Sequence, residues 1–136
     1  MALKVWIGDI IGLTSFLGSQ YLSTSERRNK SDGAIVHFQP GIIQVTEPGE
    51  YEIVPMFVPD TLSTPPGQLI VVRDPNGTPT QENSAAQQDS LDTLVVVSSL
   101  QLVAGEKFGI RWSDTLNLLF PTTRNNILIV KKIADP

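Results

Sequence analysis

The apolar residues of the chain fall in short runs that are separated by turns containing Pro or Gly. In several runs apolar and polar residues alternate with a period of two, which is the period of a β-strand and not of a helix. The runs predict strands over residues 3–7, 34–38, 42–46, 51–58, 68–73, 91–103, 107–112, 116–120 and 126–133. Because no run has a strong helical period, the pattern indicates an all-β jelly-roll sandwich of about eight to ten antiparallel strands.

The run YEIVPMFV, residues 51–58, is apolar on both of its faces. At period two its residues fall into two sets, with Tyr51, Ile53, Pro55 and Phe57 on one side and Val54, Met56 and Val58 on the other. A strand at the surface of a monomer shows one apolar face, and a strand that is apolar on both faces is covered on both. We therefore expect the second face to be covered by a second sheet or by a second copy of the protein.

Three stretches give no clear strand pattern. Residues 8–24 mix small and apolar residues without a clear period, and SERRNKSDG, residues 25–33, predicts a charged loop. DPNGTPTQENSAAQQDS, residues 74–90, predicts a long polar loop that is exposed and tolerates deletion. We expect a jelly-roll domain at residues 34–136, and residues 1–33 are either an N-terminal extension or the first strands of the same sandwich.

Composition excludes several classes of protein. The 136 residues suit one domain, and with no Cys and a single His, disulfides, thiol chemistry and Cys/His zinc sites are excluded. A net charge of −4 gives no attraction to nucleic acid. No apolar run reaches about 18 residues, and the N-terminus lacks a compact apolar core and an A-x-A cleavage site. We expect a soluble, intracellularly made protein with no membrane span, no signal peptide and no nucleic-acid partner.

The chain offers no catalytic set. No G-x-S-x-G motif is present, and His37, between two apolar residues of a predicted strand, is expected to be structural. We therefore predict that the protein is not an enzyme and has no catalytic residues, cofactor or metal. Calcium binding at loop carboxylates stays open, although a loop Asp is usually a turn former; these residues are Asp60, Asp74, Asp89, Asp92 and Asp114. The basic residues Arg27, Arg28 and Lys30 are expected to be solvated.

Three stretches share their order and spacing with a known family. In FQPGIIQVTEPGEYEI (38–53) an aromatic leads into a Gly turn, a strand and Pro-Gly-x-Tyr, and in LVVVSSLQLVAGEKFGIRW (94–112) two strands are joined by a Leu-x-x-Gly-Glu turn. NNILIVKKI (125–133) stands where that family's last, central strand closes the domain. Over about residues 34–133 the chain therefore resembles the tumour-necrosis-factor and complement-q globular-head superfamily.

The resemblance implies a ten-stranded jelly roll that packs side by side with two other copies around a three-fold axis, with one sheet facing the neighbours. The strands that are apolar on both faces are then expected to form the homotrimer interface, with Tyr51, Phe57, Val58, Leu128 and Val130 as candidates. Alternatively, the second apolar face is covered within one copy, by the edge of the other sheet or by the N-terminal segment.

As a stand-alone domain the chain resembles bacteriophage capsid decoration (cement) proteins and head-fibre proteins. We therefore expect a non-enzymatic virion structural protein, made in the host cytoplasm, that binds the major capsid protein or another virion protein and stabilises a phage head. The expected capsid contacts are the apolar N-terminal residues Leu3, Val5, Trp6, Ile7, Ile10, Ile11, Leu13, Phe16 and Leu17. The alternative is a receptor-binding or adhesive fibre-tip domain.

Overall fold

The computed structural model describes residues 3–16, 19–59, 65–88, 92–113 and 126–136. Within this part of the chain every regular element is a β-strand, and no helix that could cross a membrane is found. The strands are β1 (Lys4–Phe16), β2 (Ser19–Lys30), β3 (Ile35–Gln39), β4 (Ile42–Val45), β5 (Gly49–Phe57), β6 (Gln68–Arg73), β7 (Thr80–Ala86), β8 (Leu94–Val95), β9 (Ser98–Leu102), β10 (Lys107–Trp112) and β11 (Ile127–Ala134).

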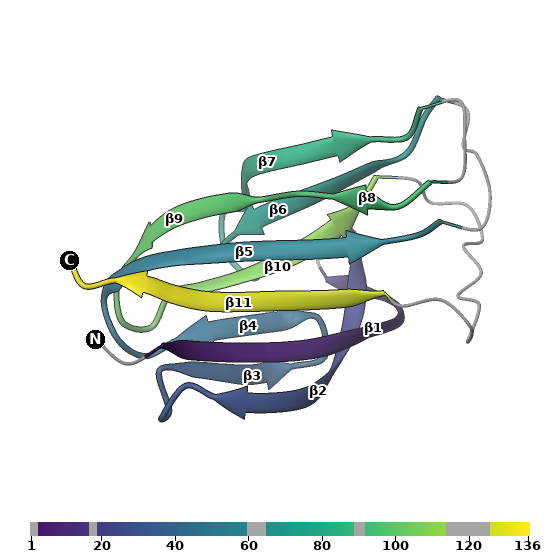
Figure 1. Ribbon diagram of the computed structural model, residues 1–136. Helices are drawn as coiled ribbons and strands as arrows, with labels where there is room; N and C mark the ends of the chain where they lie inside the picture. The colour runs from purple at the N-terminus through teal and green to yellow at the C-terminus, as the bar shows by residue number, and fades with distance from the viewer. Residues whose placement is uncertain (1–2, 17–18, 60–64, 89–91, 114–125) are drawn as a thin grey trace.

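The strands lie in two layers (Figure 1). The first layer, the front sheet, has the order β2–β1–β11–β5, and β8 and β9 both pair with the far side of β5. The second layer, the back sheet, has the order β3–β4–β10–β6–β7. The two sheets are joined where Tyr21 of β2 pairs with Arg111 of β10. All pairings are antiparallel, so the all-β jelly-roll class predicted from the sequence is confirmed.

The main core lies between the two sheets and is built from alternate residues of the strands. On β5 every second side chain is buried, and Phe57 meets Trp112 of β10 edge to face, with ring centroids 5.2 Å apart. Trp6 of β1 is also fully buried. A Cβ atom added to Gly67 would lie 2.3 Å from the Trp112 ring, so this glycine makes room for the indole. Aromatic side chains of this size supply much of the buried area that stabilises such a core.

A second, smaller cluster lies on the opposite side of the back sheet. Ile70 and Val72 point away from the main core and pack with Tyr21, and all three are at most 2% exposed. Gly109 lies beneath the Tyr21 ring, because an added Cβ would come within 3.2 Å of the ring and 2.9 Å of the carbonyl oxygen of Gly41. The β1–β2 hairpin therefore covers apolar residues of the back sheet with its own tyrosine.

Residues 8–24 and 25–33 differ from the sequence-based expectation, because β1 and β2 pair along most of their length. The register shifts between Ile7 and Gly8 and again between Ile10 and Gly12. Each bulge changes which side of the strand the next residue faces, so the alternation that marks a strand is interrupted. The predicted charged loop is wrong for the same region, since β2 runs to Lys30. The N-terminal segment therefore supplies the first strands of the sandwich.

The predicted polar loop at residues 74–90 is also wrong over much of its length. β7 (Thr80–Ala86) pairs with β6, and most of its side chains are exposed. β7 is the last strand of the back sheet, and polar residues are common on edge strands because one side has no partner strand. The predicted strand at 91–103 is divided into β8 and β9, and the one predicted at 116–120 lies outside the described residues.

Candidate interaction surface on the front sheet

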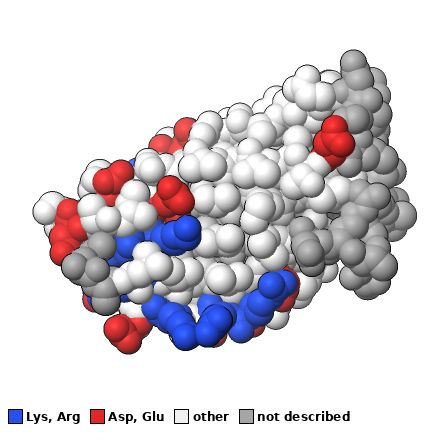
Figure 2. Space-filling view, viewed as in Figure 1, with Lys and Arg blue, Asp and Glu red and all other residues white. Residues whose placement is uncertain are grey.

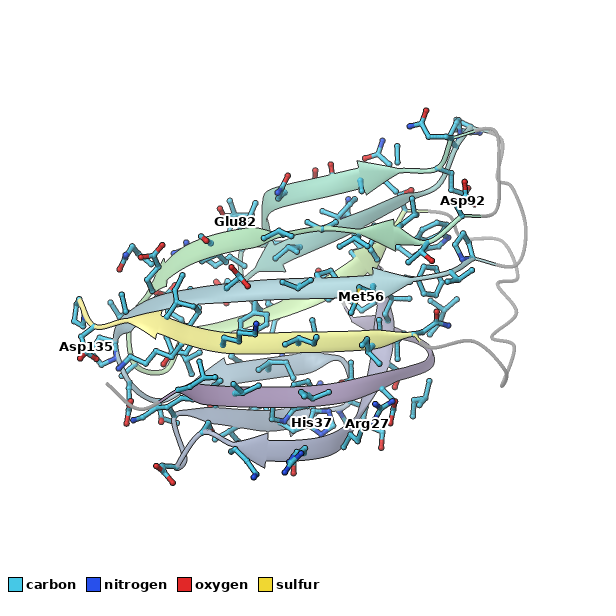
Figure 3. The ribbon with its side chains drawn as sticks, in the orientation of Figure 1. Arg27, His37, Met56, Glu82, Asp92 and Asp135 are labelled. Carbon is cyan, nitrogen blue, oxygen red and sulfur yellow. The ribbon has the colours of Figure 1, made fainter. Side chains whose placement is uncertain are left out.

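The outward side of the front sheet carries a continuous strip of apolar side chains. We call the strip the front face; it consists of Val5, Ile7, Val54, Met56, Val95, Val97, Ile127 and Ile129. Val95 is 45% exposed and Val97 56% exposed, and the other members are half-buried. Figure 3 shows Met56 on β5, near the middle of this sheet.

The front face is continuous because the strand register places its members directly opposite one another. In one row Ile7 faces Ile129, which faces Val54, and in the next row Ile127 faces Met56, which faces Val95. Residues directly opposite on antiparallel strands have Cβ atoms about 4.5–5.5 Å apart and share one face of the sheet. The sheet thus presents an apolar surface that spans the strands from β1 to β8.

Charged residues border the front face. Lys30 lies opposite Val5 and Arg28 opposite Ile7, so both stand on β2 at the edge of the strip. Figure 2, which views this side of the molecule, shows Lys and Arg gathered along that border. Glu52 of β5 lies opposite Lys131 of β11, in the row of Val5. The apolar strip therefore ends in basic residues on one side, and acidic residues stand on β5.

A network of charges around the buried Lys132 lies at one end of the sandwich. The ammonium group of Lys132, of which only 5% of the side chain is exposed, lies 3.2 Å from Glu47 and 2.8 Å from Asp135. Lys4 also donates to Glu47 at 2.7 Å, and Tyr51 donates its hydroxyl hydrogen to the Glu47 carbonyl. Hydrogen bonds from Lys4 and Lys132 lower the pKa of Glu47, and the bond to Asp135 raises the pKa of Lys132. These contacts stabilise the subunit and leave no open site.

His37 of β3 is half-buried and lies near Thr24 of β2 and Trp6 of β1; Figure 3 labels it. Its Nε2 lies 2.8 Å from the Thr24 hydroxyl, and its ring lies 5.5 Å from the Trp6 ring. The Thr24 oxygen already accepts a hydrogen bond from Gly41 N, so its own hydrogen is free to go to Nε2. Burial lowers the pKa of His37, against a smaller opposing effect of Glu26. This is the setting of a neutral, structural histidine.

Four of the five residues proposed for the trimer interface face the wrong way. Tyr51, Phe57, Leu128 and Val130 lie in the core between the two sheets and are at most 1% exposed, so they are unavailable to another copy. Val58, just after β5, is half-buried on the outward side. The period-two pattern of β5 predicts two apolar faces without indicating which one points inward.

The nine residues proposed as capsid contacts do not form one surface. Trp6 and Ile10 are in the main core and Leu13 packs against it, so these three are excluded. Val5 and Ile7 belong to the front face, whereas Leu3 and Ile11 are 67% and 58% exposed. Phe16 is part of β1, with its side chain outside the described structure, and Leu17 lies outside the described residues. The segment is a strand whose residues alternate between core and surface.

The remaining candidates from the sequence are the loop carboxylates and the basic residues of β2. Asp74 accepts a hydrogen bond from Thr78 N at 3.2 Å, as a turn former does, and Arg27 pairs with Asp9. Among the described residues no three His, Asp or Glu side chains come together as a metal site would require. Asp92 lies in the described part of the chain, and Asp60, Asp89 and Asp114 lie outside it. Arg28 and Lys30 form no ion pair with any described residue.

The sequence matches no protein-family model and no curated protein. Solved structures are similar to the chain over nearly its whole length. Murine APRIL at pH 8.0 superposes with a TM-score of 0.78 at 12% identity, covering 97% of this chain and 100% of that chain. Rabbit GITRL superposes with a TM-score of 0.67 at 10% identity, covering 98% and 96%. Bushbaby GITRL gives a TM-score of 0.61 at 12% identity over the same shares.

The fold is tumour-necrosis-factor-like. APRIL and GITRL are tumour-necrosis-factor-family jelly-roll ligands, so this part of the resemblance stated from the sequence motifs is confirmed. At identities this low the likeness shows the fold alone. Within this tumour-necrosis-factor-like sandwich, sequence reasoning missed that Val5 and Ile7, which it named as capsid contacts, share one outward face with Ile127 and Ile129. Their signal was present as Val5 and Ile7 in one run and Ile127 and Ile129 in another.

Proposed function

We propose that the protein is a non-enzymatic homotrimer whose copies cover one another's front faces. The observation that carries this proposal is the apolar strip on the front sheet, which no described residue covers. Its central row, Ile7–Ile129–Val54, runs across three adjacent strands. Contiguous apolar patches of this kind mark interaction sites when they remain open on a subunit.

The energy of such an assembly follows from the area that it removes from water. Burying apolar surface contributes roughly 25 cal/mol per Å², and a stable protein interface buries about 800 Å² on each partner. The tumour-necrosis-factor resemblance implies trimers in which one sheet faces the neighbours, and the front sheet is the one with the open apolar strip. The trimer proposed from the sequence is therefore kept, with a different set of contact residues.

For the role of the trimer we propose a virion structural protein that decorates a phage head, as expected from the sequence. Support comes from the all-β fold of the described residues, among which no group of His, Asp and Glu is placed to hold a metal. The contact with the head is reassigned, because Trp6 and Ile10 are core residues. On the back sheet, Val36 is 37% exposed and Phe38 is 46% exposed, and both remain free when the front faces are covered. Lys107 lies over the Phe38 ring at 4.3 Å and adds a positive charge to this second surface.

Two measurements test the proposal in turn. Size-exclusion chromatography with light scattering at micromolar concentration is expected to give three times the mass of one chain, and a monomer would exclude the trimer. Cosedimentation with purified phage heads is then expected for the wild type and lost in Val36→Ser/Phe38→Ser. A trimer that does not cosediment with heads but binds bacterial cells would support the fibre-tip role in place of decoration.

A further inference from the structure

The charges on the outward side of the front sheet are basic on β2 and on β11, where Lys131 lies opposite Glu52, and acidic on β5. Arg28 and Lys30 lie on β2 at one border, and Glu50 and Glu52 lie on β5 toward the other. None of the four forms an ion pair with another described residue of the same copy. Charges that a subunit leaves unpaired beside an apolar patch are available to a partner, where complementary potentials set orientation.

Lys30 and Glu52 occupy the same row of the front sheet. The register runs from Lys30 to Val5, then to Lys131 and then to Glu52. Adjacent strands are about 4.8 Å apart, so β2 and β5, three spacings apart, are separated by roughly 14 Å. A direct salt bridge within one copy would require both side chains to lie flat across Val5 and Lys131. Lys30 and Glu52 therefore lie at the same position along the strands but are too far apart to pair within a copy.

Rotation about an axis parallel to the strands leaves each residue at the same position along that axis. Copies arranged around such an axis bring the β2 border of one copy beside the β8–β9 border of the next. Lys30 of one copy then meets Glu52 of its neighbour at the same height. Glu50 lies on the same side of β5, two residues away. Lys30 and Glu52 are too far apart to pair within one copy, but this arrangement of copies allows them to pair between neighbours.

The shapes of the two borders match as well. A hollow of about 230 Å³ on the β1–β2 border is lined by Val5, Ile7, Arg28 and Lys30. On the opposite border Val97 is 56% exposed, and it immediately precedes Ser98, which lies opposite Ile53. Val97 is thus close to the row of Val54, which is also the row of Ile7. An exposed apolar side chain on one border stands at the height of the hollow on the other.

We propose that in this trimer the hollow beside Lys30 and Arg28 of one copy receives Val97 of the next copy, and that Lys30 pairs with Glu52, which lies one strand inside the β9 border of that neighbour. The inference rests on the proposed trimer and names a charge pair and an apolar contact at its interface. A contact between two different patches closes into a ring when the rotation allows it. A shift of two residues would still pair Lys30 with Glu50 or Arg28 with Glu52, but only the unshifted register also places Val97 at the height of the hollow.

The test is a charge exchange between Lys30 and Glu52. Lys30→Glu and Glu52→Lys each place like charges at all three interfaces. We expect each to weaken association about fivefold per interface, on the order of a hundredfold for the whole trimer, as followed by light scattering over a dilution series. The double variant Lys30→Glu/Glu52→Lys restores opposite charges and is expected to recover most of the loss. Asn76→Glu, which adds an acidic side chain to the exposed turn before β7, is the control and leaves the dissociation unchanged.

Mixing the two single variants tests whether the pair forms between copies. In a ring of three that contains both variants, two of the three interfaces pair opposite charges, so the mixture is expected to associate more tightly than either variant alone. High salt is expected to reduce the difference between variants and wild type, because it screens exposed charges. Circular dichroism on each variant confirms that the fold is retained.

The outcomes separate the two proposals. A wild type that is monomeric at micromolar concentration overturns the trimer itself. A wild-type trimer whose single reversals behave like Asn76→Glu overturns the Lys30–Glu52 pairing and leaves the trimer standing. The pairing is also wrong if the double variant stays as weak as the single ones, or if the mixture gains nothing.

Discussion

Both sheets carry apolar side chains on their outward faces, but the two faces are covered to different extents. On the back sheet, Ile70 and Val72 point away from the core, yet they are at most 2% exposed because Tyr21 of the β1–β2 hairpin packs on them. On the front sheet, Val54 and Ile129 also point away from the core, but no described residue covers them. The chain thus covers one outward apolar surface with its own hairpin, and no described residue covers the other.

The two outward faces are therefore expected to contribute differently to the stability of one copy and to its association with other molecules. Apolar residues that the chain covers itself contribute to the stability of a single copy, whereas residues on an open face contribute only when another molecule binds. Substitutions on the two faces should therefore have different consequences even where the residue types are the same.

The largest contrast is expected between two adjacent residues of β11. Val130→Asp puts an unpaired charge into the core, which costs roughly 5 kcal/mol or more, comparable to the stability of a whole domain. We expect this variant to be unfolded by circular dichroism. Ile129→Asp places the same charge on the front face, and we expect a folded monomer by light scattering. If Ile129→Asp remains a trimer at micromolar concentration, the front face is not the interface.

Removal of β7 is expected to have the next largest effect. Replacing residues 80–86 by a short Gly-Ser linker leaves β6 without a partner on one side and uncovers Val71 and Leu69. The melting temperature should fall by more than about 10 °C, since several kcal/mol of pairing and burial are lost. A linker of the same composition placed at the 74–78 turn serves as the control. An unchanged melting temperature would mean that β7 contributes little to the back sheet.

Substitution of Tyr21 should lower the free energy of unfolding without changing the association of the copies. Tyr21→Ala uncovers Ile70 and Val72 and leaves a cavity above Gly109, at a cost of about 3 kcal/mol in the free energy of unfolding. Urea unfolding measures this cost, and Tyr21→Phe keeps the ring and should lose much less. The mass of the assembled protein at high concentration is expected to stay the same in both variants. A loss of assembly without a loss of stability would reverse the roles assigned to the two faces.

The smallest effect concerns the pH dependence of stability through His37. Burial lowers its pKa in the folded state, so on acidification the unfolded chain takes up a proton before the folded chain does. The contribution is therefore present above the ordinary His pKa of about 6.5 and is lost as pH falls toward the folded value, by at most about 1.4 kcal/mol per pH unit. Urea unfolding at several pH values between 7.5 and 5.5 should show this loss in the wild type. His37→Gln should remove that slope; a slope that is unchanged would assign the titration to another group.

Sequence reasoning worked best where strands were regular and failed where geometry interrupted the pattern. The runs at 68–73 and 107–112 match β6 and β10 in their bounds, because their apolar residues are continuous and bounded by turns. β1 and β2 were obscured by bulges at Ile7/Gly8 and Ile10/Gly12, and β7 by the polar composition of an edge strand. The motifs at 38–53 and 94–112 nevertheless carried the tumour-necrosis-factor resemblance, since turn chemistry is local and survives such irregularities.

The sequence by itself determined that β5 and β11 need cover on both faces, because each carries apolar residues at odd and at even positions. It did not determine which set faces the core, since a period-two pattern is unchanged when the two faces are exchanged. That choice depends on which residues interdigitate with the opposite sheet. Trp112, packed against Phe57, places the odd-numbered residues of β5 inside, and the register with β11 then places Ile129 outside. Only the packing of distant strands could decide this, because the residues that make the choice are far apart in the chain.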